Sequence, residues 1–150
     1  MKIKLSVSDE CYDEVKKFLT DHNIETDDES EYILIQKNKY PDRLSVRNIK
    51  TGAKQLVNVD NIVTIESYGH TVEVHTENDV YNTSERLYQL MNMLDPKNFI
   101  RVSNSVIVSK NMISEIIPTL SRKFILKMKN GDRVDVTRSY YNSFKETFQI

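Results

Sequence analysis

The stretch Ile62-Val63-Thr64-Ile65-Glu66-Ser67-Tyr68-Gly69-His70-Thr71-Val72-Glu73-Val74-His75-Thr76 decides the fold class. On both sides of Tyr68-Gly69-His70, apolar β-branched residues alternate with polar ones, which is the period of a strand with one buried face. Glycine turns the chain easily between two such segments. The stretch therefore predicts a β-hairpin with strands at Val63–Ser67 and Thr71–Thr76.

The chain beyond this hairpin predicts further short strands and little helix. Asn130-Gly131-Asp132 favours a tight hairpin turn. One helix is expected to start at a Thr83 or Ser84 cap and to end at Asp95-Pro96. A short closing helix is expected over Arg138–Phe148. The expected strands are Val80–Asn82, Phe99–Val102, Ser105–Val108, Ser114–Pro118, Phe124–Met128 and Arg133–Val136.

On the N-terminal side, a further hairpin precedes the central one. Leu44, Val46 and Asn48 alternate with charged residues before a Thr51-Gly52 turn, and Gln55–Val59 is expected to return beside them. Upstream of this hairpin, residues 37–43 (KNKYPDR) contain Pro41-Asp42, which favours a turn. We therefore expect a joint between two parts of the chain at this segment.

Residues 1–43 predict a small acidic strand–helix–strand unit. Alternating Ile3, Leu5 and Val7 predict a strand, and Ser8 is a candidate cap for a helix with an apolar stripe on one side. An acidic turn at residues 25–31 then leads to a second strand at Tyr32–Ile35. Such a unit is too small to be stable alone. The fold class predicted for the whole chain is mainly β, α+β overall, with residues 44–150 as an antiparallel β domain.

Composition and charge limit the class of protein. The 150 residues have hydrophobic and charged fractions of 39% and 29%, as in a soluble globular protein. The N-terminus and the apolar runs are too short for a signal peptide or a membrane span, which predicts a cytoplasmic protein. Cys11 is the one cysteine and is interpreted as a packing residue.

Charge is distributed unevenly along the chain. Residues 1–31 hold four Lys/Arg and ten Asp/Glu, whereas residues 97–150 hold ten Lys/Arg and four Asp/Glu. This asymmetry suggests a polyanionic partner at the C-terminal end.

The sequence contains no recognisable enzyme motif. Its three glycines stand alone in turns, so a phosphate-binding glycine loop is excluded. His22, His70 and His75 are isolated in the sequence, and we expect neither a metal site nor a cofactor. The predicted helix over residues 84–95 faces inward with large apolar residues, so it is not a recognition helix. If the chain binds DNA, loops and strand ends must make the contacts.

Three ordered segments resemble the signatures of LytTR DNA-binding domains of bacterial transcription regulators. They are the central hairpin, the segment Phe99–Val108 continuing to Ile113 and Ile116, and Asn130-Gly131-Asp132 followed by Val134, Val136 and Arg138-Ser139-Tyr140. The match covers about a hundred residues. The resemblance implies an elongated fold of short antiparallel strands, in which loops enter the major groove of double-stranded DNA.

The resemblance also implies which residues read the bases. They are His70, Asn104 and Arg138, and their chemistry fits: Arg can bond two acceptors of guanine, Asn can bond adenine in the same way, and His can donate to guanine. Phosphate contacts are expected from Arg101, Ser105, Lys110, Arg122 and Lys123, which position the protein without reading sequence. As alternatives, His70 and Asn104 are turn residues and Arg138 pairs with an acidic neighbour such as Glu146.

The chain departs from the family pattern at two positions. Ser103 stands where the family usually has His, and Lys110 stands where Asn is common. The first change weakens any role of that His, and the second shifts binding towards less specific electrostatics.

Residues 1–43 leave no room for a phosphoacceptor receiver domain, so we expect a stand-alone regulator. The N-terminal unit is expected either to dock on the DNA-binding domain or to pair with a second copy as a homodimer. Two other functions remain open: a protein-interaction module that has lost DNA binding, which the change at Ser103 would explain, and a ligand-sensing repressor with the N-terminal unit as its sensor.

Overall fold

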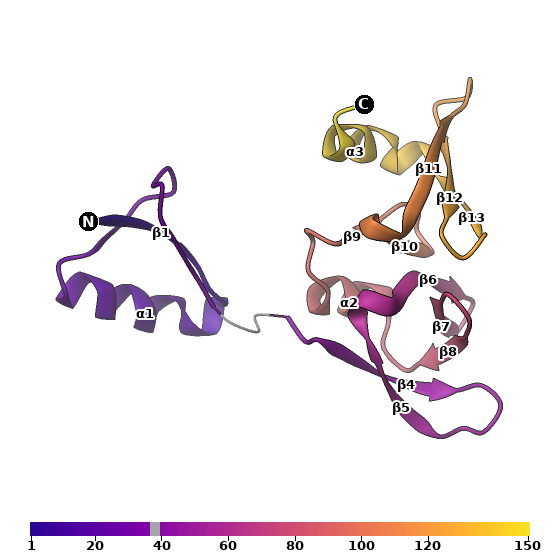
Figure 1. The fold of residues 1–150 in the computed structure, drawn as a ribbon, viewed down its shortest axis with the longest axis horizontal. Coiled ribbons are helices and arrows are strands. Elements are labelled where there is room, and N and C mark those ends of the chain that lie inside the picture. Colours follow the sequence, from indigo (N-terminus) through magenta and orange to yellow (C-terminus); the bar gives the residue numbers. More distant parts are fainter. Residues whose placement is uncertain (37–39) are drawn as a thin grey trace. The chain divides into compact units, whose positions relative to one another are not determined.

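The computed structural model describes residues 1–36 and 40–150. The chain forms two compact units, Met1–Lys39 and Tyr40–Ile150 (Figure 1). Residues 37–39, at the start of the predicted joint, lie outside the described residues. The division into a unit of residues 1–43 and a domain of residues 44–150 stays a prediction.

The N-terminal unit contains the predicted strand–helix–strand arrangement. Strand β1 (Lys2–Ser6) is followed by helix α1 (Asp9–Asp21), and β3 (Ile33–Ile35) pairs in parallel with β1. A two-residue strand, β2 (Glu25–Thr26), pairs with the other edge of β1, within a stretch for which we predicted only an acidic turn. Parallel pairing requires the crossover that α1 supplies.

The core of this unit is small. Among its described residues, Ile3 and Leu19 are the buried apolar side chains, whereas Phe18, Tyr32, Ile33 and Ile35 are exposed. In the register that pairs Lys4 with Ile33 and Ser6 with Ile35, these two isoleucines share one face of the sheet. The unit therefore exposes apolar residues that a larger core would cover.

The second unit is built on an antiparallel seven-stranded sheet of order β5-β4-β8-β7-β6-β10-β9. The central pair is the predicted hairpin, with β6 over Ile62–Tyr68 and β7 over Thr71–Thr76. A bulge between Ile62 and Thr64 breaks the register at the start of β6. The other strands are β4 (Arg43–Asn48), β5 (Lys54–Asn58), β8 (Val80–Thr83), β9 (Phe99–Arg101) and β10 (Val106–Ser109).

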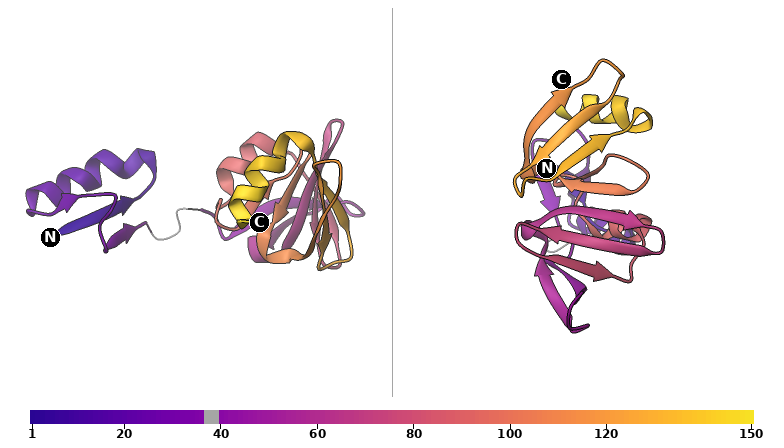
Figure 2. Two further views of the ribbon diagram at one scale, coloured as in Figure 1. Left: turned by 90° about the horizontal axis from the view of Figure 1, so that it is seen from above. Right: turned by 90° about the vertical axis from the view of Figure 1, so that its right-hand side faces the viewer.

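A second antiparallel sheet follows in the chain. Its order is β11-β12-β13, with strands Ile113–Pro118, Phe124–Met128 and Arg133–Val136. Figure 2 shows these strands in orange beside the magenta strands of the larger sheet. Single 3-10 turns at Val59–Asn61 and Lys110–Met112 precede β6 and β11. The mainly β, antiparallel fold class predicted from the sequence is confirmed.

Of the two remaining helices, one has the predicted bounds and the other starts later than predicted. Helix α3 covers Arg138–Phe148, as predicted. Helix α2 covers only Leu87–Met93, so the prediction of a helix starting at Thr83 or Ser84 was wrong. Instead, the Thr83 hydroxyl accepts a hydrogen bond from the Glu85 amide, and the Gln89 side chain accepts one from the amide of Arg86 at the true N-cap. Thr83 thus stabilises the turn that precedes α2.

Two apolar clusters stabilise the second unit. The first lies between α2 and one face of the larger sheet, and Ile65, Val74 and Leu90 are fully buried in it. The second joins residues of the larger sheet, such as Val63 and Val108, to β12, β13 and α3. Because this second cluster packs α3 against β12, β13 and Val102, which precedes β10, it positions the candidate site.

Candidate nucleic-acid interface

Four loop segments of the second unit are joined at one end of the strands. They are residues 69–70 between β6 and β7, 102–105 between β9 and β10, 119–123 between β11 and β12, and 137–140 at the start of α3. We call this set the loop edge. It gathers predicted site residues that are far apart in the sequence.

Four hydrogen bonds connect these segments with one another and with the end of β6. The Ser67 amide donates to the Ser105 carbonyl at 2.8 Å, and the Thr137 amide donates to the Val102 carbonyl at 3.0 Å. Tyr140 Oη donates to Asn104 Oδ1 at 3.1 Å, and Arg138 Nε donates to the Ser121 carbonyl at 3.3 Å. The loops are thus fixed relative to one another before any ligand binds.

His70 lies exposed on the β6–β7 turn. The turn needs Gly69, whose φ of 59° lies in the left-handed region. Arg86 supports it from the other side, because its Nη1 lies 3.5 Å from the His70 carbonyl oxygen and donates to it. The backbone of the turn is therefore held while the imidazole remains exposed.

Asn104 lies on a loop that Arg101 closes. Arg101 donates from Nε to the Ser103 carbonyl at 3.0 Å and from Nη2 to the Asn104 carbonyl at 2.6 Å. Ser103 is buried and its hydroxyl lies 3.3 Å from that of Ser105. Arg101 thus positions Asn104. The phosphate contact predicted for Arg101 from the sequence stays a prediction.

Arg138 is the first residue of α3 and lines a pocket of about 610 Å³. The pocket combines four of the predicted site residues with three small polar ones, and none of its side chains is a carboxylate. The backbone amides of the first helical turn add partial positive charge there. The lining residues are Ser103, Asn104, Ser105, Lys123, Thr137, Arg138 and Ser139.

The two other predicted phosphate contacts differ in position. Arg122 lies on the β11–β12 turn with a φ of 58°, and its guanidinium lies 5.7 Å from the centre of the Tyr141 ring. Lys110 follows β10, at the end of the strand opposite to Ser105, and its Nζ donates to the Pro96 carbonyl at 3.0 Å. The structure therefore places Lys110 outside the loop edge, so the phosphate contact predicted for it from the sequence is not part of the interface proposed below.

One supporting residue, Arg86, was missed in the sequence, and so was the partner of Tyr140, a residue of the third family signature. Arg86 and Tyr140 each bond a loop that carries a predicted base contact. Their distance in sequence from those loops left no local pattern to find them. Only the pairing of strands and the packing of α3 bring them together.

A cluster of titratable groups lies on the face of β6 and β7. His75 Nε2 is 3.9 Å from carboxylate oxygens of Glu66 and Glu73, and His75 Nδ1 is 3.8 Å from Asp132. Glu66 also accepts a hydrogen bond from Tyr68 Oη, which, with burial and nearby carboxylates, raises the pKa of Tyr68 to about 12. His75, isolated in the sequence, is thus not isolated in the fold. Within residues 1–36 and 40–150, no group of three or more His, Cys, Asp or Glu side chains is arranged to hold a metal.

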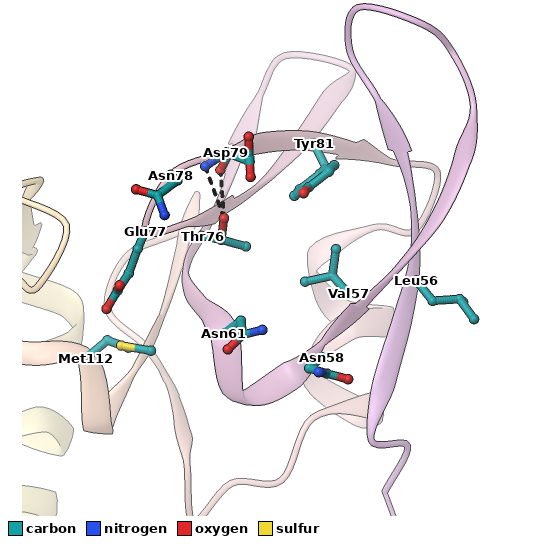
Figure 3. A pocket seen from close by; sticks show the side chains of 10 residues that line it. All are labelled: Leu56, Val57, Asn58, Asn61, Thr76, Glu77, Asn78, Asp79, Tyr81 and Met112. Carbon is teal, nitrogen blue, oxygen red and sulfur yellow. Dashed lines mark hydrogen bonds between the residues drawn. The ribbon is translucent and has the colours of Figure 1, made fainter.

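A second pocket, of about 430 Å³, lies at the opposite end of β6 and β7 (Figure 3). Asn58, Asn61, Asn78 and Tyr81 are among its lining residues, and the Thr76 hydroxyl and the Asp79 backbone bond each other at its rim. Burial and Asp79 raise the pKa of Tyr81. This pocket contains no Lys or Arg, in contrast to the pocket at the loop edge.

Comparison with known families decides the nature of this unit. Residues 52–149 match the model of the LytTr DNA-binding domain family. The chain belongs to this family. The match includes every segment of the loop edge, so the resemblance noted in the sequence is confirmed over about two thirds of the chain.

Individual bacterial proteins are similar to the same part of the chain. The chain is 35% identical over 95 residues to the sensory transduction protein LytT of Bacillus anthracis, a match that covers 63% of this chain and 39% of that protein. It is 29% identical over 90 residues to the transcriptional regulatory protein LytR of Staphylococcus aureus, covering 60% and 37%. The chain thus matches less than half of the length of these relatives.

A solved structure shares the fold. The LytTr DNA-binding domain of a putative methyl-accepting/DNA response regulator from Bacillus cereus superposes with a TM-score of 0.68 and 25% sequence identity. The superposition covers 73% of this chain and 98% of that domain. Separately, no helix in the described part of the chain is long and apolar enough to cross a membrane.

Proposed function

We propose that the loop edge binds double-stranded DNA sequence-specifically, with its loops in the major groove, and that the chain regulates transcription in this way. The observation that carries the proposal is the hydrogen-bonded loop edge with His70, Asn104 and Arg138 on three of its segments. The relatives named as regulators support the regulatory role. The role is one of binding without catalysis, in the cytoplasm where bacterial DNA lies.

The chemistry of the three side chains supports base contacts. Arg138 offers a guanidinium fork for guanine, and Asn104 keeps its amide NH₂ for adenine while its Oδ1 accepts from Tyr140. His70 has an exposed imidazole that can donate to guanine. Ser105 and Lys123, which line the same pocket as Arg138, are placed to contact phosphate.

The experiment is selection of duplexes from a random library by the full chain, followed by titration of the enriched duplex and of a scrambled one at several salt concentrations. We expect one enriched sequence, a steep loss of affinity with salt and a clear preference for the enriched duplex. A footprint on the DNA upstream of the coding sequence would locate a natural site. Weak binding without sequence preference would contradict the proposal and favour a protein-interaction or ligand-sensing module.

We also propose that the chain acts as a homodimer supported by the N-terminal unit. Strand β3 is an edge strand, and its Ile33 and Ile35 are 50% and 53% exposed. An unpaired apolar edge is a template for pairing with another strand. A second copy presents the same edge, so pairing about a twofold axis would cover both.

Sedimentation tests the dimer. We expect the full chain to sediment as a dimer, and both Ile33→Asp and deletion of residues 1–43 to shift it towards the monomer. Lys17→Asp, an exposed change on α1, is the matched control and should leave the dimer intact. If deletion of residues 1–43 changes neither assembly nor thermal stability, the dimer proposal is wrong.

A further inference from the structure

Leu120 is the most exposed large apolar residue of the described chain, with a relative exposure of 107%. It lies at the tip of the β11–β12 turn, within the loop edge. Single exposed leucines are common and carry little meaning by themselves. This one differs because of how its turn is built and what surrounds it.

The turn is held rigidly from within. The Thr119 amide and hydroxyl both donate to the Lys123 carbonyl, at 3.1 and 2.8 Å, and the Thr119 hydroxyl also lies 3.3 Å from that of Ser121. Arg122 takes a left-handed φ of 58°, which closes the turn. Leu120 is therefore held out at the tip of an ordered loop.

The turn is also held from outside by the candidate site itself. Arg138 Nε donates to the Ser121 carbonyl, next to Leu120 in the chain. Arg122 lies over the Tyr141 ring of α3. The position of the leucine is thus coupled to the position of Arg138, a predicted base contact.

The charge around Leu120 favours nucleic acid over a second copy of this chain as the partner. Arg122 and Lys123 follow Leu120 closely in the same turn, Arg138 bonds the Ser121 carbonyl, and residues 119–123 and 137–139 contain no Asp or Glu. A second copy of this surface would be repelled, whereas a polyanion is attracted. This apolar group is therefore presented at a surface that attracts a polyanion such as DNA.

We propose that Leu120 is a specificity-determining residue that contacts a thymine methyl group in the major groove. Apolar side chains recognise thymine there, because the 5-methyl group is the apolar feature that distinguishes a T·A pair. Arg138 and Leu120 would then read neighbouring bases, one by hydrogen bonds and one by apolar contact. This inference rests on the proposed DNA binding.

The test uses the full chain and the duplex that it enriches from a random library. Each thymine of that duplex is replaced in turn by uracil, which removes only the methyl group. We expect one or two positions at which uracil weakens wild-type binding about threefold to tenfold, the loss that one buried methyl contact supplies. Leu120→Ala should weaken binding to the thymine duplex by a similar factor, and uracil at those positions should cause no further loss.

Two controls separate a local contact from other effects. Leu56→Ala changes another exposed leucine, 60% exposed on β5, and should bind like the wild type. Leu120→Ala should keep the unfolding temperature and the slope of affinity against salt, because it removes neither core nor phosphate contacts.

The outcomes distinguish the two levels of the proposal. If no duplex is enriched, the proposed function itself fails and the role of Leu120 fails with it. If a duplex is enriched but Leu120→Ala binds it like the wild type, DNA binding stands and the thymine contact is wrong. The same holds if, relative to the wild type, the substitution weakens binding to the thymine duplex and to the uracil duplexes by the same factor.

Discussion

The two units of the chain differ in how completely they bury their apolar residues. In the N-terminal unit, Ile3 and Leu19 are buried, while a three-residue apolar strand at Ile33–Ile35 is exposed along its whole length. In the second unit, two clusters bury both faces of the β6–β10 region around Ile65 and Val63. The second unit can therefore hold a preorganised site, whereas the first leaves apolar side chains exposed that a larger core would cover.

Charge follows the same division. The first 31 residues are strongly acidic and the last 54 strongly basic. The basic residues of the loop edge lie around a pocket without carboxylates. A polyanion is thus attracted to the basic C-terminal part of the chain and repelled by the acidic N-terminal part.

The largest expected effect comes from opening the second core. Phe144 is fully buried and packs against Phe124 and Phe148. Phe144→Ala should lower the free energy of unfolding by about 3–5 kcal/mol, from lost transfer energy and the cavity that remains. Urea denaturation measures this loss.

Leu19→Ala is the matched change in the N-terminal core. It should leave the main unfolding transition, that of the second unit, nearly unchanged. A loss for Phe144→Ala below about 1 kcal/mol, or an equal loss for Leu19→Ala, would mean that the two units do not differ in packing as described.

A smaller effect is expected at the DNA interface. Arg138→Ala should cost about 1–3 kcal/mol of binding free energy and relax the preference at a single base position. Titration with the enriched duplex and its single-base variants measures both. Equal loss on all sequences would assign Arg138 to phosphate contact instead.

Two lysines serve as controls for this prediction. Lys17→Ala removes a cation from the N-terminal unit, and Lys110→Ala removes one from the far end of β10. Both variants should bind within about twofold of the wild type, since neither lysine lies on the loop edge. A loss at Lys110 as large as that at Arg138 would show that the interface extends beyond the loop edge.

The smallest effect concerns pH. The hydrogen bond to Glu66, together with burial and nearby carboxylates, raises the pKa of Tyr68 from its ordinary 10.0 to about 12. Because the folded pKa lies above the unfolded one, this bond stabilises the fold below pH 10 and its contribution is lost as the pH rises towards 12. Tyr68→Phe should therefore be slightly less stable than the wild type at pH 8, with the difference falling above pH 10.

Phenolate absorbance during a pH titration checks the same interaction. The wild type should show a late-titrating tyrosine near pH 12 that is absent from Tyr68→Phe. Glu66→Gln should move that titration towards lower pH, because it removes the charge that opposes ionisation. An unchanged curve in Tyr68→Phe would contradict the assignment.

Local patterns predicted most of the secondary structure. Alternation of apolar and polar residues located β6 and β7, and α3 covers the range Arg138–Phe148 that was predicted for it. The start of α2 was missed because Thr83 and Ser84 are good caps by composition, while Thr83 uses its hydroxyl for a turn before Arg86. The Thr83 hydroxyl could cap a helix or accept a bond within a turn, and which of the two it does depends on how the neighbouring elements pack.

The sequence by itself determined the fold class and the family, because these follow from periodicity and from motifs that are short in sequence. Through the family resemblance it also predicted which residues contact the bases. The tertiary structure alone decided which of these residues lie together. It joined Asn104 to Tyr140 and Arg138 to Ser121, left Lys110 at the other end of β10, and presented Leu120 beside them. Contacts between residues 17 to 36 positions apart depend on strand register and core packing, which no local pattern encodes.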